Sequence, residues 1–388
     1  MTATVEEVLA GREVVVTCGS GGVGKTTMAA ALGTLAALHM GGRVLVLTVD
    51  PARRLADALG LEALGNVSRR VPQDAFSAAG LAPRGELWAA MLDTKASWDD
   101  LVRVQAPDEQ TAARILANRM YENITGTFVQ SHDYIAMERL YELHTSGDWD
   151  LLVIDTPPTR NAIDFLDAPA RMADFFSSRF LRLLTAPARS RFATAASRPF
   201  YQVADRILGS QFLEDIAEFF LLFQSMYDGF VERARAVEAL LSDRRTTFVV
   251  VSTLEAAPVR EAEFFCDELA ARRLHLGAVV LNRVLPEWMA DPAAGVLAHE
   301  LDADPRPMAE RLVLTDRVDA EVDVAEVAAT LDTIADNYLR YQIVARREAT
   351  ERDRMARRAD VVARVPLVAG DIGDVAALAA IAEELRRG

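Results

Sequence analysis

The stretch that decides the fold is EVVVTCGSGGVGKTT, Glu13–Thr27. It opens with a short apolar run rich in β-branched side chains, which predicts a buried parallel strand over Glu13–Cys18. Glycines then interrupt the apolar pattern, and an alanine- and leucine-rich helix is expected from Thr26 to about Met40, where two glycines would stop it. A strand, a glycine loop and a helix in this order indicate one unit of an α/β domain.

Similar apolar runs recur along the rest of the chain and predict further strands. They are Arg43–Val49, Glu86–Leu92, Trp149–Asp155, Thr247–Ser252 and Leu276–Asn282. Because helical stretches separate these runs, we expect an α/β fold with a doubly wound, mostly parallel sheet. In such a sheet, ligands bind beyond the carboxyl ends of the strands.

Two stretches without strand-like alternation divide the sheet domain. The predicted parts are residues 1–93, the first part of the core; 94–145, a helical segment; 146–161, a core strand and its loop; 162–244, a helical subdomain; and 245–388, the second part of the core, with a long helix over 322–358. A last segment, Val365–Gly373, and a closing helix to Leu385 complete the core.

Composition and charge exclude several classes of protein. Hydrophobic residues make up 51% of the 388, too many for a disordered chain. No apolar run approaches the ~20 residues of a membrane span, and no export signal begins the chain, so we expect a cytoplasmic protein without stable membrane insertion. Acidic residues outnumber basic ones by 57 to 42, and the net charge of −15 argues against nucleic acid as a partner.

The cysteines and histidines predict no metal centre. Cys18 and Cys266 are too few for a disulfide framework or a four-thiolate site, and we expect both to be small buried hydrophobes. The five histidines are scattered and show no H-x-x-x-H spacing. Neither zinc nor an iron–sulfur cluster is therefore expected.

The glycine loop carries the strongest chemical signal. Gly19–Thr26 matches the pattern G-x-x-x-x-G-K-[ST], in which main-chain N–H groups cradle phosphate oxygens at a helix N-terminus. Lys25 would neutralise the β- and γ-phosphates of a nucleotide triphosphate, and the Thr26 hydroxyl would bind Mg²⁺. The expected contacts are Gly21, Gly22, Val23, Gly24, Lys25, Thr26 and Thr27. The alternative is a glycine-rich turn without a ligand.

Two aspartates follow apolar strands and are candidates for the chemistry. Asp155 would hold Mg²⁺ through water, and the loop after it would respond to the γ-phosphate. Asp50 ends the neighbouring strand and would orient the attacking water. The alternatives are a helix cap for Asp155 and an ordinary Asp-Pro turn for Asp50.

Three motifs in order resemble the ArsA/GET family of ATPases: GGVGKTT (Gly21–Thr27), VDPARRLADALG (Val49–Gly60) and VIDTPPTRNAIDFL (Val153–Leu166). That family contains the arsenite-pump ATPase and the ATPase that escorts tail-anchored membrane proteins. The similarity covers nearly the whole chain and is greatest to the actinobacterial ArsA-like ATPases. It implies a dimeric, Mg²⁺-dependent ATPase that closes around nucleotides, with Asp50 as the catalytic aspartate of switch I and Asp155 in switch II.

The resemblance also assigns residues in the second half of the chain. The stretch from Thr253 to Ala262 is similar to the family's loop toward the partner subunit. Asn282 looks like the residue that reads adenine, and Pro366 and Leu367, with the valine after them, look like the loop that stacks on it.

One departure from the family pattern concerns catalysis. Ser20 stands where the family usually has a signature lysine that stabilises charge on the transferring phosphate across the dimer. A serine cannot supply that cation. This leaves three alternatives: hydrolysis is slow, a paralogous partner provides its own lysine, or a nearby arginine takes the place of the lysine. The arginine candidates are Arg53, Arg54 and Arg160, each of which could equally be an exposed side chain in an arginine-rich chain. We favour a heterodimer with a lysine-bearing paralogue over a homodimer.

Other departures concern metals. The cysteine pair that binds zinc in some escort dimers is absent, since LPEWM occupies Leu285–Met289. Cys18 and Cys266 do not resemble the metalloid-binding cysteines of the arsenite pump.

Two functions from different classes follow. The first is ATP hydrolysis that drives a conformational change in the helical layer; the second is a nucleotide-gated scaffold or binding subunit with weak or no hydrolysis. The helical subdomain is rich in Phe, Leu and Met, which could line a groove for a hydrophobic protein client or form an ordinary core. Those residues are Met172, Phe175, Phe176, Phe180, Phe219, Phe220, Leu221, Leu222, Phe223 and Met226.

Overall fold

The computed structural model describes residues 3–49, 54–118, 120–121, 129–156, 226–315, 323–368 and 370–387, and the separate positions 167, 171, 174, 219 and 221–222. Within them, strands and helices alternate from α1 (Val5–Leu9) to α18 (Val375–Arg387). No helix of the described part is both long and apolar enough to cross a membrane.

The described strands form one sheet of eight, in the order β3-β4-β2-β5-β1-β6-β7-β8. The pairing of β3 with β4 is antiparallel and all other pairs are parallel. The bounds are β1 (Val14–Cys18), β2 (Arg43–Thr48), β3 (Arg69–Arg70), β4 (Glu86–Met91), β5 (Leu151–Asp155), β6 (Thr246–Ser252), β7 (Leu276–Val284) and β8 (Val362–Pro366). The doubly wound, mostly parallel α/β sheet is thus confirmed.

The central strands explain why the sequence predicted them so well. Every position of β1, β5 and β6 is buried, because helices cover both faces of the sheet, and such strands read as continuous apolar runs. Two edge strands were less visible. β3 is a pair of exposed arginines and was not predicted. β8 (Val362–Pro366) overlaps the predicted last segment, Val365–Gly373, which was not assigned as a strand because the residues of β8 alternate between buried and exposed and form no continuous apolar run.

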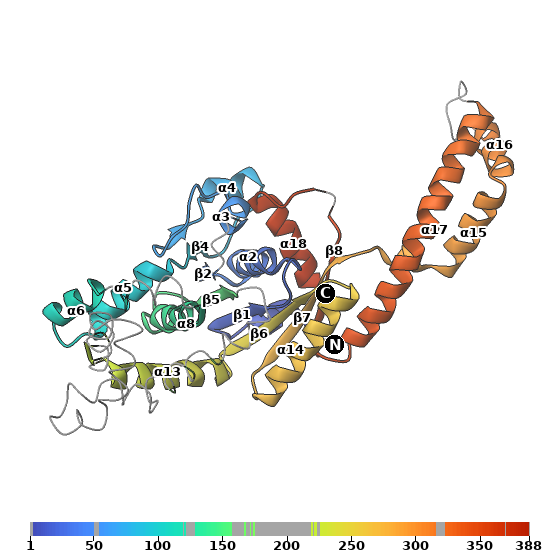
Figure 1. Ribbon diagram of the computed structural model, residues 1–388. Coiled ribbons are helices and arrows are strands. Elements are labelled where there is room, and N and C mark those ends of the chain that lie inside the picture. Colours follow the sequence, from blue (N-terminus) through green and yellow to red (C-terminus); the bar gives the residue numbers. More distant parts are fainter. Residues whose placement is uncertain are drawn as a thin grey trace, which may run out of the picture.

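Helices cover both faces of the sheet (Figure 1). Their bounds are α2 (Lys25–Leu35), continued by a π-helical turn (Ala36–Met40), α3 (Arg54–Ala58), α4 (Gln73–Ala78), α5 (Thr94–Gln105), α6 (Glu109–Leu116), α8 (Val129–Thr145), α13 (Tyr227–Ser242), α14 (Ala256–Ala271), the 3-10 turn η2 (Glu287–Ala290), α15 (Pro292–Ala303), α16 (Arg306–Leu314) and α17 (Val324–Met355). Alternate residues of β1 divide between the two hydrophobic clusters: Val15 packs toward α2 and α18, and Val16 packs toward α8, α13 and α14.

The face formed by α5, α8 and α13 contains an aromatic core. The rings of Trp98, Tyr134 and Phe230 lie 5.7 to 6.4 Å apart, and a partly buried ion pair of 2.6 Å joins Glu138 on α8 to Arg233 on α13. Most of the expected helical subdomain over 162–244 lies outside the described residues.

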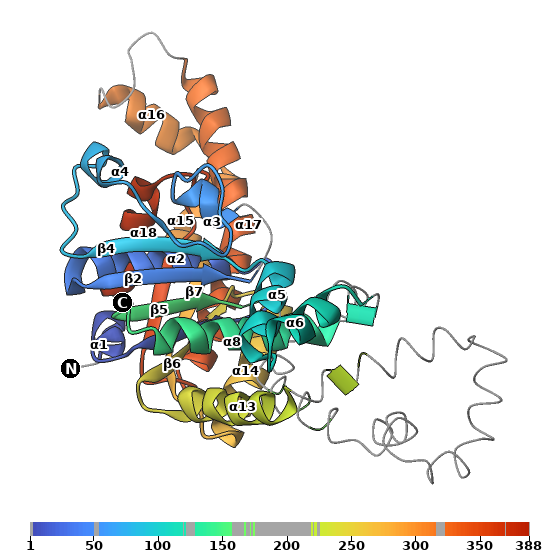
Figure 2. The same ribbon diagram turned by 90° about the vertical axis from the view of Figure 1, so that its left-hand side faces the viewer.

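An arm made of α15, α16 and α17 projects from the sheet (Figures 1 and 2). The first two helices pack on the third around a small core of Ala309, Val327 and Ala328. The division of the chain in the sequence analysis included these helices in the second part of the core and did not separate an arm.

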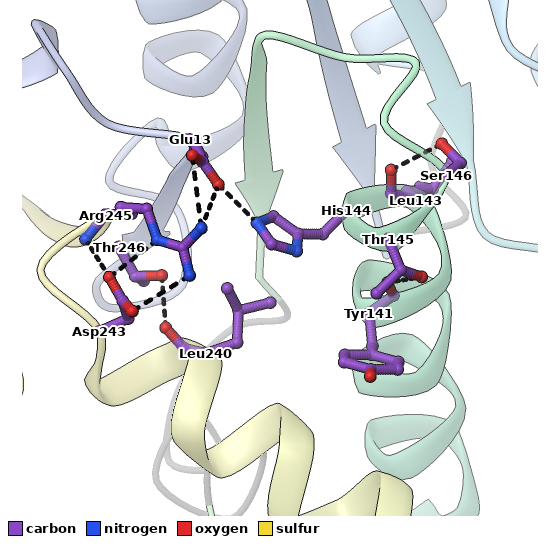
Figure 3. Close-up of polar contacts among 10 residues, drawn as sticks. All are labelled: Glu13, Tyr141, Leu143, His144, Thr145, Ser146, Leu240, Asp243, Arg245 and Thr246. Carbon is purple, nitrogen blue, oxygen red and sulfur yellow. Dashed lines mark hydrogen bonds and ion pairs between the residues drawn. The ribbon is translucent and has the colours of Figure 1, made fainter.

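At the amino edge of the sheet, charged side chains join several elements (Figure 3). Glu13, just before β1, contacts His144 at the end of α8 at 2.8 Å and Arg245, just before β6, at 3.2 Å. Arg245 also pairs with Asp243 at 3.0 Å, and its hydrogen bonds lower the pKa of Asp243 to about 2. These contacts fix the ends of α8 and α13 to the sheet.

Candidate functional site

The glycine loop connects β1 to α2 at the carboxyl edge of the sheet, as the sequence predicted. Gly19 passes so close to the neighbouring strand that a Cβ there would overlap the carbonyl oxygen of Val251. Gly24 has a φ of +94°, which L side chains rarely adopt, and it is the N-cap of α2. No side chain caps this helix, so its first-turn N–H groups point into the loop, an arrangement that favours an anion.

Lys25 is the first residue of α2 and is 7% exposed. Its Nζ donates a hydrogen bond of 3.0 Å to the main-chain carbonyl of Ser20. Ser20, which we predicted to stand in place of a signature lysine, therefore contacts Lys25 through its main-chain carbonyl. Burying a charged amine is unfavourable unless polar groups compensate for the lost water, and the loop supplies such groups.

Asp155 is fully buried at the carboxyl end of β5. Strand pairing places it beside Thr17 at the end of β1 and beside Thr48 at the end of β2. The Thr48 hydroxyl donates to Asp155 Oδ2 at 2.9 Å, and the Thr156 hydroxyl donates to the Thr17 carbonyl at 2.7 Å. The roles of these threonines were not predicted, although each is a polar residue near the end of a largely apolar strand.

The oxygen donors at this edge fit a hard divalent cation. A hydroxyl from Thr26 and a carboxylate from Asp155 are ligands of the kind that Mg²⁺ prefers, and Mg²⁺ sites normally combine one or two carboxylates with phosphate oxygens and water. In the described part of the chain, no group of three or more His, Cys, Asp or Glu residues could hold a metal ion by itself.

Several predicted site residues lie outside the described residues. They are Asp50, Arg53 and Arg160, and the side chain of Arg54 is likewise not described. The last described residue before Asp50 is Val49, whose N–H donates to the carbonyl of Asp155 at 3.2 Å.

Asn282, predicted to read adenine, lies against the glycine loop. Its Nδ2 donates to the Val23 carbonyl at 2.8 Å, and its Oδ1 accepts from the N–H of Arg283 at 2.9 Å. A Cβ at Gly24 would approach Asn282 Nδ2 to 2.5 Å, so this contact also requires glycine in the loop. Arg283 has a φ of +59°, an unusual conformation for a non-glycine residue, and it interrupts the pairing of β7 with β8.

The predicted stacking loop follows β8 at the same edge of the sheet. Strand pairing puts Val365 beside Asn282, and the Leu367 N–H donates to the Val284 carbonyl at 3.1 Å. Leu367 is 54% exposed, and Pro366 lines a pocket of about 270 Å³. Leu367 is thus an exposed apolar side chain just after the strand that pairs with Asn282, whereas the pocket lined by Pro366 also contains Arg364 and Glu384 and does not include Asn282.

The two cysteines are buried in the hydrophobic cluster shared with α14. Burial raises the pKa of Cys18 far above its usual value, and the Cys266 thiol adds to this effect. Burial also raises the pKa of Cys266 to about 11. Both thiols are thus protonated near neutral pH, a state that disfavours metal binding.

The described apolar residues of the helical layer are partly core. Phe219 and Met226 are each 1% exposed and belong to the cluster that contains Trp98 and Phe230. Leu221 and Leu222 are half-buried. The remaining candidates for a client groove, Met172, Phe175, Phe176, Phe180, Phe220 and Phe223, lie outside the described residues.

Comparisons with known proteins agree with this geometry. A family model described as an anion-transporting ATPase matches residues 12–300. An uncharacterized protein of Streptomyces coelicolor is 30% identical over 284 residues, which cover 71% of this chain and 65% of that protein. The ATPase ASNA1 homolog of Entamoeba dispar is 24% identical, with 69% and 75% of the two chains covered, and a putative arsenical pump-driving ATPase of Aquifex aeolicus is 25% identical, with 69% and 62% covered. The chain therefore spans just under two thirds of the Streptomyces and Aquifex relatives.

Proposed function

The chain belongs to the anion-transporting ATPase family, and from this premise we propose that it binds Mg²⁺·ATP at the glycine loop and hydrolyses it at an interface between two chains. The released energy would drive a conformational change in the helical layer or in a bound partner. One observation carries most of this proposal: a buried lysine begins helix α2 directly after β1, and a buried aspartate ends the neighbouring strand β5 at the same edge of the sheet.

Each residue of the site has a defined task in this proposal. Lys25 and the N–H groups of the loop bind the phosphates, and Thr26 with Asp155 holds Mg²⁺, which neutralises charge on the β- and γ-phosphates. Asp50 orients the attacking water. Asn282, Pro366 and Leu367 bind the base, a role supported by their common position at the carboxyl edge of the sheet.

Ser20 favours a second candidate function. Without the signature lysine, the chain could bind ATP only to order a complex, as a nucleotide-gated scaffold or binding subunit with weak or no hydrolysis. Single-turnover hydrolysis with Mg²⁺ present distinguishes the two. We expect bound ATP to be converted to ADP by the native chain and about 100-fold more slowly by Asp50→Asn, the range expected for loss of a proton-transfer residue. A native chain that leaves bound ATP intact both alone and in the presence of its paralogue would support the scaffold.

The partner in the dimer is a further part of the proposal. We favour a lysine-bearing paralogue, because its lysine would supply the cation that Ser20 cannot. The test is the hydrolysis rate of the purified chain alone and mixed with its paralogue. A marked increase on mixing is expected, whereas full activity of the chain alone would contradict the heterodimer. A hydrophobic protein client remains a proposal for the helical layer, supported by its Phe, Leu and Met content.

A further inference from the structure

Three polar residues lie side by side across the middle of the sheet, at its carboxyl edge. Strand pairing aligns Thr17 of β1 and Thr48 of β2 with Asp155 of β5, which lies between them. All three are buried, with exposed fractions of 1% or less. Residues two apart point to the same face of a strand, so this row shares the face of Val46 and Val153, which pack in the cluster with α2. The row therefore lies on the face of the sheet that the helix after the glycine loop covers.

The threonine hydroxyls at this edge have different acceptors. Thr17 donates to the Ile154 carbonyl at 3.1 Å, and Thr156 donates to the Thr17 carbonyl at 2.7 Å. Thr48 donates to a side chain instead, at 2.9 Å from Asp155 Oδ2. Of these three hydroxyls, the first two satisfy the backbone, and that of Thr48 acts on a carboxyl group.

The main chain of Asp155 is held by the strand end that also carries Thr48. The N–H of Val49 donates to the Asp155 carbonyl at 3.2 Å, and the pairing of β5 with β1 and β2 fixes the residues before it. With the backbone fixed, the remaining freedom of Asp155 is rotation about its side-chain bonds. A well-formed hydrogen bond to one carboxylate oxygen restricts that rotation and so determines where the carboxylate points.

A hydroxyl is suited to this task because it carries no charge. An arginine or a lysine in its place would also hold the carboxylate, but it would neutralise the negative charge. The hydroxyl of Thr48 orients Asp155 and leaves that charge available to a cation. Removing a group that orients a metal-binding side chain typically lowers metal affinity by about 10- to 100-fold.

We propose that Thr48 is a positioning residue of the Mg²⁺ site, whose hydroxyl holds the Asp155 carboxylate in the orientation that acts on the cation. This inference rests on the proposed function, because it presupposes Mg²⁺·ATP at the glycine loop. Thr48 lies two residues before Asp50, so one strand end carries both the donor to Asp155 and the candidate for orienting water. Loss of the hydroxyl weakens the metal site and leaves binding of the metal-free nucleotide unchanged.

The first test replaces the hydroxyl by a methyl group of nearly the same size. Thr48→Val removes the donor to Asp155, and Thr48→Ser keeps it. The matched control is Thr246→Val at the amino edge, where an equally buried threonine begins β6 and donates to the Leu240 carbonyl at 2.7 Å (Figure 3).

The readout is the affinity for Mn²⁺, a paramagnetic substitute for Mg²⁺. It is measured by electron paramagnetic resonance in chains loaded with a non-hydrolysable ATP analogue. Thr48→Val should bind Mn²⁺ about tenfold more weakly than the native chain, whereas Thr48→Ser and Thr246→Val should stay within about twofold of it. If Thr48→Val does not fold, Thr48→Ala, which lacks the hydroxyl and adds no bulk, is measured with the same expectation.

The second test separates the metal site from the rest of the nucleotide site. Calorimetry with ATP in the presence of EDTA should give the same affinity for the native chain and for Thr48→Val. A threonine with only a structural task would lower thermal stability without changing the Mn²⁺ affinity.

The outcomes distinguish this inference from the function on which it rests. A native chain that binds the analogue but no Mn²⁺ would show that the proposed Mg²⁺ site is wrong, and the role of Thr48 would fall with it. A native chain that binds Mn²⁺ no more tightly than Thr48→Val, or an equal loss in Thr48→Ser, would overturn the role of Thr48 alone.

Discussion

The two edges of the central sheet are built differently. At the carboxyl edge, glycines form the turn between β1 and α2. The charged side chains of Lys25 and Asp155 are buried there, and they contact a main-chain carbonyl and a threonine hydroxyl, respectively. At the amino edge, Glu13 and Arg245 are partly exposed and join the ends of several elements through ion pairs (Figure 3).

The difference separates the charges that connect structural elements from those that we propose bind a ligand. Exposed ion pairs contribute little to the free energy of folding. Those at the amino edge connect the ends of several elements and do not require a particular environment. Burying a lysine or an aspartate is costly, so their position beside an anion-binding helix N-terminus is best explained by the charged ligand they would bind.

The largest effect is expected from replacing Asp155 by asparagine. The side chain keeps its shape and can still accept from Thr48, but it loses the charge that would act on Mg²⁺. Hydrolysis of ATP should fall about 10- to 100-fold, with a higher Mg²⁺ concentration required for half-maximal rate. The matched control is Asp150→Asn, just before the same strand at the amino edge, where the carboxylate accepts from the Arg43 N–H. An equal loss of ATP hydrolysis in Asp155→Asn and Asp150→Asn would contradict the different roles assigned to the two edges.

A smaller effect is expected from Gly24→Ala. The methyl group would be strained at a φ of +94° and would press on Asn282, so the loop must shift. ATP affinity measured by calorimetry should weaken about tenfold, which corresponds to roughly 1.4 kcal/mol. Gly11→Ala is the control, because its φ is +74° and a Cβ there would meet nothing within 4 Å. Both variants should lose about 1 kcal/mol of folding stability, but only Gly24→Ala should bind ATP more weakly.

The smallest effect is expected from Glu13→Gln at the amino edge. The substitution removes the charge from a side chain that is 42% exposed, contacts His144 and forms an ion pair with Arg245. The free energy of unfolding in urea should fall by less than about 1 kcal/mol, and the loss should shrink in high salt. ATP affinity should stay at the native value. A weakened nucleotide site in this variant would show that the two edges are coupled.

The sequence predicted the central sheet well because its signals are local. The strands β1, β5 and β6 are buried on both faces, so each can be recognised from a short apolar run. The glycine loop can likewise be recognised from a short motif, because its backbone conformation requires glycines at fixed positions. Lys25 was predicted from the motif of the glycine loop, and Asp155 from its place at the end of an apolar run. The hydrogen bond from Thr48 to Asp155 was not, because it depends on which strands are neighbours, and that order follows from the whole sheet.

The arm was not predicted as a separate part for a related reason. A long amphipathic pattern over α17 indicates a helix, but not whether it packs on the sheet or on α15 and α16. Asn282 is another such case. The strand end was predicted, but the contact of its side chain with Val23 brings together residues far apart in the sequence.

The central claim is that the loop around Lys25 binds a nucleotide triphosphate, and calorimetry with ATP and Mg²⁺ tests it most directly. Lys95, the other lysine of the chain, is 65% exposed and pairs with Asp99, so Lys95→Ala is a matched control. We expect Lys25→Ala to weaken ATP binding about 100-fold, in line with the loss of charged hydrogen bonds to phosphate, and Lys95→Ala to leave binding unchanged. A folded Lys25→Ala variant that binds ATP as tightly as the native chain would contradict the account.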